Sequence, residues 1–300
     1  MCLTLNEYLK AKFGVRVQKI PLDAGLNCPN RDGTKGKGGC IYCNGTGSGT
    51  GAAACGKDLH QQMEDGMKWA QRRYGATRFL SYLQSFSNTY APLKRLAEIY
   101  RTVLAPDEVV GISIATRPDC IDEERLMLIK EMAGRKMVWM EYGLQSANDA
   151  TLKRINRGHS FQDFVNAVNI THEFGIPVCC HVIFGLPGET PEDMQNTIER
   201  VRMSGVEGIK FHQLSVLKGT CLQRLWEDGD YQPISQGLYT ELVAWAVRHL
   251  GSECVIHRLA ADHSADVLLA PLWSLKKAET IQMIYKRLNC NKHNVPKFRD

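Results

Sequence analysis

The stretch IPLDAGLNCPNRDGTKGKGGCIYC, residues 20–43, joins a short apolar segment to a loop that carries three cysteines. Cys40 and Cys43 form a C-x₂-C pair, and Cys28 lies eleven intervening residues upstream. Three thiolates can hold three irons of a cubic [4Fe–4S] cluster and leave the fourth iron open to a small molecule. A structural metal site normally fills every coordination position. The count of three therefore favours a site with chemistry over a purely structural one.

Apolar segments with the period of a strand alternate with amphipathic helical segments along most of the chain. The predicted strands are residues 17–22, 78–84, 109–115, 137–144, 176–184 and 207–214, with a weaker one at 255–260. The predicted helices are residues 58–74, 93–103, 122–133, 161–174, one that begins after Thr190, 237–250 and 278–288. Six strand–helix units in succession indicate an α/β fold with a parallel sheet covered by helices.

We predict that this sheet curls into a partial (β/α)₆ TIM-like barrel with a C-terminal extension. No G-x-G-x-x-G motif follows the first strand, which disfavours an open nucleotide-binding sheet. Parallel barrels carry their chemistry at the C-terminal ends of the strands, and the cysteine loop directly follows the first strand. The expected core is residues 1–250 with a cluster loop at 25–56, followed by a C-terminal extension and polar tail at 251–300.

Composition limits the environment and the partners of the chain. No run approaches the 18 apolar residues of a membrane span, and residues 1–14 lack the apolar core of a signal peptide. Eleven cysteines without such a signal indicate a reducing compartment, so we expect a cytoplasmic protein with no membrane partner. The net charge of +5 is compatible with an anionic partner such as RNA but does not require one.

A fourth cysteine leaves a different metal site open. Cys55 lies eleven intervening residues beyond Cys43, which extends the pattern to C-x₁₁-C-x₂-C-x₁₁-C. Four thiolates at this spacing are compatible with a structural zinc site.

Five sequence blocks in a fixed order carry a resemblance to a known family. They are residues 20–43, ISIATRPD at 112–119, MEYGLQSANDATLKRINRGH at 140–159, HVIFGLPGETPED at 181–193 and GIKFHQLSVLKGT at 208–220. Together they resemble the radical S-adenosylmethionine (SAM) superfamily, and within it the YhcC/YtqA-like proteins. The long gap before the C-x₂-C pair departs from the common C-x₃-C-x₂-C spacing and is similar to that of Elongator-type relatives. The resemblance covers about residues 15–275.

The resemblance implies a [4Fe–4S] cluster and SAM as cofactors. Cys28, Cys40 and Cys43 would ligate the cluster, whose open iron would chelate the amino and carboxylate groups of SAM. Reduction by a partner such as flavodoxin or ferredoxin would cleave SAM to a 5′-deoxyadenosyl radical, which would take a hydrogen from the substrate. The cofactors carry this chemistry, and the protein orients and shields it.

The family motifs also imply residues that contact SAM. Gln145 and Arg157 fall on positions that contact the ribose and the carboxylate in related enzymes, and a planar guanidinium suits a carboxylate. Tyr42, inside the C-x₂-C pair, is either a surface aromatic or a cover for the cluster and one edge of the adenine.

The segment after the second predicted strand and one residue of the fifth depart from the family pattern. Gln84, Ser85 and Ser87 stand where relatives carry a small Gly-Gly-Glu-type segment for the methionine amino group. His181 stands where some relatives carry an aspartate for the ribose hydroxyls, so it is either a SAM contact or a core histidine.

For several polar residues near other strand ends, the sequence leaves two interpretations open. Arg117 and Asp119 either pair with each other or line the substrate side. Lys210 and His212 alternate on the sixth strand and share one face, which is either the lumen or the outside. The pair His257–Arg258 is a further candidate for the mouth of the barrel.

The resemblance points to a tRNA wobble uridine as substrate, and hence to tRNA as a partner. The basic tail KHNVPKFRD, residues 292–300, adds modest support. Three alternatives stay open: a small-molecule or protein substrate, a zinc-stabilised barrel of unrelated chemistry, and a non-catalytic RNA-binding scaffold.

Overall fold

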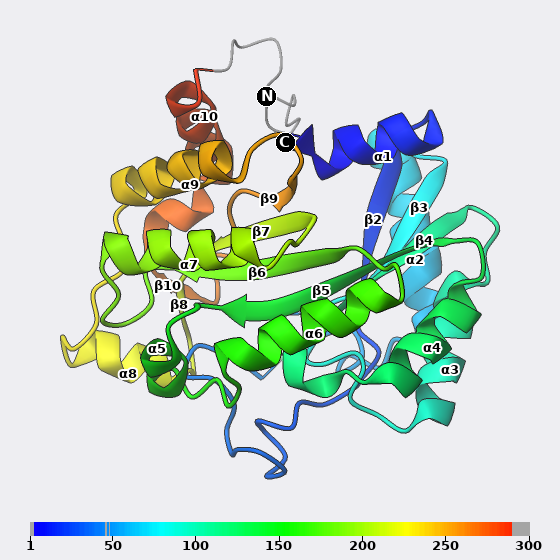
Figure 1. Cartoon of the computed structure of the whole chain (residues 1–300), viewed down its shortest axis with the longest axis horizontal. Helices are drawn as coiled ribbons and strands as arrows, with labels where there is room; N and C mark the ends of the chain where they lie inside the picture. Colours follow the sequence, from blue (N-terminus) through cyan, green and yellow to red (C-terminus); the bar gives the residue numbers. More distant parts are fainter. Residues whose placement is uncertain (1–2, 46, 48, 290–300) are drawn as a thin grey trace.

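Eight parallel strands form one curled sheet in the computed structural model, which describes residues 3–45, 47 and 49–289 (Figure 1). Along the sheet the strands follow the order β1 (Leu3–Thr4), β9 (Val255–Arg258), β7 (Gly208–Gln213), β6 (Val178–Phe184), β5 (Met137–Gln145), β4 (Val109–Thr116), β3 (Arg78–Leu83) and β2 (Val17–Leu22). The edge strands β1 and β2 do not pair with each other, so the barrel is open on one side. The predicted α/β fold with a partial TIM-like barrel is confirmed.

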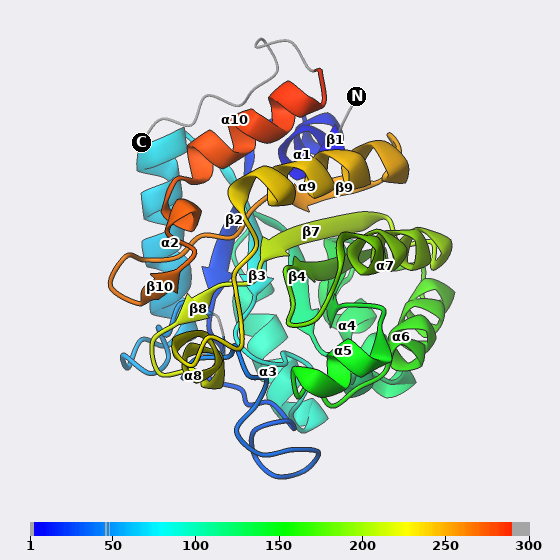
Figure 2. The same ribbon diagram turned by 90° about the vertical axis from the view of Figure 1, so that its left-hand side faces the viewer.

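Helices cover the outer face of the sheet (Figures 1 and 2). They are α2 (Leu59–Tyr74), α3 (Leu93–Leu104), α4 (Glu123–Ala133), α6 (Phe161–Glu173), α7 (Pro191–Met203) and α9 (Gln236–Leu250), on which α10 (Lys277–Arg287) packs. Shorter elements lie at the strand ends: α5 (Asp149–Arg154), α8 (Cys221–Glu227), and the antiparallel pair β8 (Val216–Leu217) and β10 (Leu268–Ala270). None of the helices in the described part of the chain is long and apolar enough to cross a membrane.

The strands β2 to β7 are the six main strands that the sequence predicts, β9 is the weaker strand predicted at 255–260, and β1 extends the sheet without having been predicted. β9 comes from the segment expected as a C-terminal extension, and it pairs in parallel with both β7 and β1. Residues 290–300, which include most of the predicted polar tail, lie outside the described residues.

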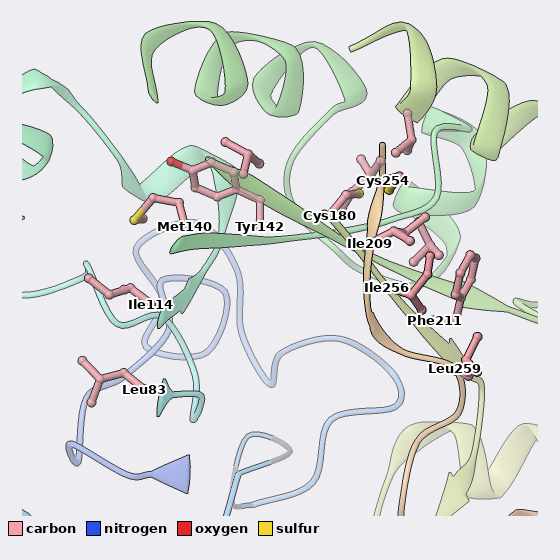
Figure 3. Close-up of a cluster of buried hydrophobic side chains, with 14 of the residues drawn as sticks. Leu83, Ile114, Met140, Tyr142, Cys180, Ile209, Phe211, Cys254, Ile256 and Leu259 are labelled. Carbon is pink, nitrogen blue, oxygen red and sulfur yellow. The ribbon is translucent and has the colours of Figure 1, made fainter. Parts of the chain in front are cut away.

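Alternation along each strand separates two environments. Met140 and Tyr142 on β5, and Ile209 and Phe211 on β7, belong to the large apolar core between sheet and helices (Figure 3). The residues between them point the other way, into the lumen, because successive side chains of a strand face opposite sides of the sheet.

An N-terminal helix that the sequence analysis did not predict closes the bottom of the barrel. α1 (Leu5–Phe13) begins at a capping box in which Thr4 and Glu7 bond each other's backbone, and it contacts both β2 and β9. Its Leu5 and Leu9 are buried in a cluster with Trp139 and other inward residues of the lower strands. The helix therefore spans the gap between β2 at one edge of the sheet and β1 with its neighbour β9 at the other.

We expect Leu9→Ala to lower the free energy of unfolding by about 2–5 kcal/mol, because Leu9 is 1% exposed and its truncation leaves a cavity. Met203→Ala is the matched control, since Met203 is 74% exposed, and its effect should stay within about 0.5 kcal/mol. Urea denaturation of both variants checks this, and equal effects would mean that α1 does not close the barrel.

Candidate active site at the barrel mouth

A cavity opens where the strands end, between the cluster loop and the lumen. Its walls carry polar side chains from almost every strand of the barrel. The polar and cysteine side chains that line it are Cys28, Arg31, Cys40, Tyr42, Cys43, Tyr82, Gln84, Ser87, Thr116, Arg117, Glu141, Gln145, Arg157, His181, Lys210, His212 and Arg258.

The three predicted ligand cysteines come together in this cavity. Cys28 and Cys40 are buried and Cys43 is half-buried. The neighbouring Cys43 thiol, and then the charge of Arg157, hold the pKa of Cys40 well below its usual range although burial opposes them. A thiolate is the form that ligates metal.

Cys55 takes no part in this arrangement. Its side chain is exposed, and it is absent from the cavity that the other three cysteines line. The geometry thus gathers three thiols rather than the four that the zinc alternative needs.

The guanidinium of Arg157 lies beside the cysteines. Its Nη1 lies 3.6 Å from the Cys40 sulfur, and its Nη2 donates to the carbonyl oxygen of Gly143 at 2.6 Å. Its Nε is buried without a hydrogen-bond partner among the described residues. Arg157 therefore offers one unused donor at the cavity.

Gly143 leaves the space in which Gln145 and Arg157 approach each other. A Cβ on Gly143 would lie 2.7 Å from Gln145 Nε2 and 2.8 Å from Arg157 Nη2, distances that real side chains do not tolerate. Gln145 itself has a φ of 81°, in the left-handed region that a non-glycine residue adopts at some energetic cost. This turn at the end of β5 aims the amide at the mouth.

The segment after β3 divides into residues inside and outside the cavity. Gln84 and Ser87 line it, and the Ser87 hydroxyl is buried without a partner among the described residues. Ser85 does not line it: it packs under the cluster loop, where a Cβ on Gly49 would lie 1.8 Å from its hydroxyl oxygen. Ser85 is thus placed as a contact of the loop rather than of the cavity.

Tyr42 lines the cavity between the paired cysteines. Its hydroxyl is buried and has no hydrogen-bond partner among the described residues. Its ring packs against the apolar cluster that contains Leu152 and Ile155.

Arg117 and Asp119 of the TRPD motif pair with each other, and of the two only Arg117 is among the described residues that line the cavity. Arg117 donates to both oxygens of Asp119 at 2.8 and 2.9 Å and to the carbonyl oxygen of Arg157 at 2.7 Å, while lining the cavity. Lys35 of the cluster loop binds the same carboxylate at 2.7 Å. The group fastens the loop to the ends of β4 and α5.

The lumen below the mouth contains a polar network around one carboxylate, Glu141, which is fully buried on β5. Lys19 lies 2.5 Å from its Oε1, while Lys210 and His181 lie 3.0 and 2.7 Å from its Oε2. Ser113 also donates to Oε1, and His257 Nδ1 lies 3.5 Å away. Lys210 and His212 therefore face the lumen, which settles the choice left by the sequence.

Burial shifts the titration of this network. Burial alone would raise the pKa of Glu141. The charges of Lys19 and Lys210, and then the hydrogen bond from His181, lower it by more, so the pKa of Glu141 lies well below its usual range. Burial lowers the pKa of His181 to about 3, so its ring is neutral. His181 lines the cavity, yet its Nε2 is engaged by Glu141.

The chain belongs to the radical SAM superfamily. The model of that superfamily matches residues 28–201, and a radical SAM C-terminal domain matches residues 206–289. Within it the chain belongs with YtqA of Bacillus subtilis, to which it is 40% identical over 95% of this chain and 88% of that protein. It is 38% identical to YhcC of Escherichia coli K12 over 88% and 85% of the two chains.

More distant relatives share only part of the chain. A tRNA uridine(34) acetyltransferase of Dehalococcoides mccartyi is 31% identical over 47% of this chain and 30% of that protein. The solved structure of an archaeal Elp3 from Methanocaldococcus infernus, lacking residues 1–46, superposes with a TM-score of 0.70 at 18% identity, over 80% of this chain and 60% of that one. This likeness concerns the fold.

The residues at the mouth fit the [4Fe–4S] cluster and SAM that the superfamily uses. Cys28, Cys40 and Cys43 supply three thiolates, and Arg157 compensates part of their charge. Unpaired buried atoms of Tyr42, Ser87 and Arg157 point to a polar ligand in the same cavity. When bound there, these cofactors would supply one-electron reduction of SAM and a radical able to abstract hydrogen. The three cysteines would hold the cluster, and the cavity walls would shield it from water.

Sequence reasoning missed one feature of this site, the central role of Glu141. The alternation of Met140, Glu141 and Tyr142 in an otherwise apolar strand was its only signal. A charged residue there indicates a lumen-facing position that needs partners.

We expect Cys28→Ser, Cys40→Ser and Cys43→Ser each to lose most of the iron and acid-labile sulfide after anaerobic reconstitution. Cys55→Ser should retain both, because Cys55 lies outside the cavity. Iron and sulfide analysis with visible absorption checks this. A colourless Cys55→Ser protein, or a wild-type protein with zinc and no iron, would contradict the assignment.

We expect Glu141→Gln to destabilise the fold by about 3–5 kcal/mol at pH 7, because Lys19 and Lys210 lose their counter-ion in a buried site. Since the pKa of Glu141 is lowered on folding, its contribution is present above the ordinary carboxyl pKa and is lost as pH falls through the lower folded value. Urea denaturation at pH 7 and in the acid range should show less acid sensitivity in Glu141→Gln than in the wild type. Equal acid sensitivity would contradict this.

Proposed function

We propose that this radical SAM enzyme modifies a uridine in tRNA, in the cytoplasm, with the wobble position as the leading site. The observation that carries the proposal is a group of exposed cationic side chains on the cluster loop, on α5, and on α8 with the turn before it, which are neighbouring segments. The partial match to a tRNA uridine(34) acetyltransferase supports the same substrate class.

These cations lie on the cluster loop, on α5, and on α8 with the turn before it. Ile41, next to the ligand Cys40, donates its backbone N–H to the Ile155 carbonyl beyond α5 at 3.1 Å, and its carbonyl accepts from Leu222 of α8 at 2.8 Å. The cluster loop, α5 and α8 therefore lie side by side at one end of the molecule (Figures 1 and 2).

Each of these elements, or the turn that leads into it, carries exposed lysine or arginine. The four are Lys37, Lys153, Lys218 and Arg224. None of them forms an ion pair with another residue that the structure describes, so their charge is available to phosphates. Contacts of this kind supply most of the affinity for a nucleic acid and position it without reading its sequence.

The enzyme also needs a reductant, for which flavodoxin or ferredoxin is the proposed partner. Dithionite replaces it in the test. Comparing the nucleosides of tRNA from cells with and without the protein should reveal one uridine derivative that is lost, and the purified enzyme with SAM and dithionite should restore it. An unchanged nucleoside profile with intact 5′-deoxyadenosine formation would favour a small-molecule or protein substrate instead.

Replacing Lys37, Lys153, Lys218 and Arg224 together by glutamine should weaken tRNA binding by about tenfold or more and reduce its salt dependence. The matched control replaces four exposed cations on helix ends at the opposite side: Lys10, Arg72, Arg101 and Lys130. Fluorescence anisotropy with labelled tRNA at two salt concentrations measures both. Equal loss in the two quadruple variants would mean that binding depends on net charge rather than on this surface.

A further inference from the structure

An arginine without a counter-ion faces the lumen. Arg258 is the last residue of β9 and lines the cavity, and Lys210 of β7 is its partner in the strand register. Its guanidinium forms no hydrogen bond or ion pair with any residue in the described part of the chain. A guanidinium that is partly withdrawn from water normally has an acceptor, so this one needs an explanation.

Glu141 is the only carboxylate among the described residues that line the cavity, and it cannot supply that acceptor. The two oxygens of a carboxylate offer about four lone-pair sites. In Glu141 these are taken by Lys19 and Ser113 on Oε1, and by His181 and Lys210 on Oε2. The charge of Arg258 is therefore additional to a network that is already saturated.

A second unused polar group lies close to the same place. His212 lines the cavity, its ring centroid is 5.4 Å from that of His181, and its Nε2 is buried without a hydrogen-bond partner among the described residues. Burial, and then the charge of Arg258, keep its pKa well below the usual range, so the ring is neutral. A neutral imidazole beside a cation can donate to an anion without adding charge.

We propose that the lumen binds an oxyanion of the substrate, a carboxylate or a phosphate, through Arg258 with His212 as a second donor. The planar fork of arginine matches both groups. The substrate would then enter with its anionic group foremost and the rest of the molecule towards the cysteines. The inference goes beyond the proposed function and holds whether the oxyanion belongs to a nucleotide or to a free acid.

The test uses anaerobic, cluster-loaded protein saturated with SAM. Succinate and inorganic phosphate are titrated separately at constant ionic strength, and binding is followed by calorimetry. We expect one or both anions to bind the wild type, and Arg258→Gln to weaken that binding by about tenfold or more. His212→Gln should weaken it less. Arg101→Gln, which removes an exposed cation on the last turn of α3, should have no effect.

The pattern of anions identifies the group: succinate alone supports a carboxylate, phosphate alone a phosphate, and both a general oxyanion site. Three results would overturn the proposal: neither anion binds the wild type, Arg258→Gln binds as well as the wild type, or Arg258→Gln weakens SAM binding by the same factor. The last result would assign Arg258 to the SAM site. If Arg258→Gln does not fold, Arg258→Lys decides, because loss of the fork should still weaken anion binding several-fold.

Discussion

Glu141 forms hydrogen bonds or ion pairs with side chains on five other strands of the barrel. They are Lys19 of β2, Ser113 of β4, His181 of β6, Lys210 of β7 and His257 of β9. A carboxylate removed from water is unfavourable unless its partners are held in good geometry. The curvature of the sheet provides that geometry, since only a curled sheet brings β2 and β9 to the same acceptor. The network therefore forms only in the curled sheet. In turn, its hydrogen bonds and ion pairs fix the positions of the strands around the lumen.

The cofactor end depends on a second set of contacts that reach from the strands to the loop. Arg117 bonds the carbonyl oxygen of Arg157, and Arg157 lies against the Cys40 sulfur. Through Asp119 the same arginine is joined to Lys35 of the cluster loop. A glycine-rich loop alone would have many conformations. These contacts restrict it, so that the three thiols face one cavity.

The two ends of the cavity differ in chemistry. The mouth combines thiols with unpaired neutral donors and the three arginines Arg31, Arg117 and Arg157. The lumen combines a saturated ion-pair network with a guanidinium that has no acceptor among the described residues. The cofactors fit the first. The proposed oxyanion site lies in the second, on Arg258 and His212, which are not among the residues to which the family motifs give a role.

The sequence predicted a structural feature where the pattern that indicates it is local. The period of Met140, Glu141 and Tyr142 predicts a strand with two faces, and Thr190 followed by Pro191 predicts the start of α7, where the structure has a capping box. The alternation of Lys210 and His212 predicts a common face, but their side of the sheet follows only from its curl. α1 went unpredicted because its burial depends on strands more than 70 residues away along the chain, such as the one with Trp139.

The sequence by itself determined the strand–helix alternation, the three cysteines with their spacing, and the family. These depend on residue type and short-range order, which a linear pattern retains. Only the tertiary structure decided that Cys55 lies outside the cavity, that Ser85 supports the loop, and that Arg258 has no acceptor among the described residues. Each of those is a statement about which groups meet in space. Pairing between β7 and β9, and saturation of Glu141 by partners from several strands, have no counterpart in local sequence.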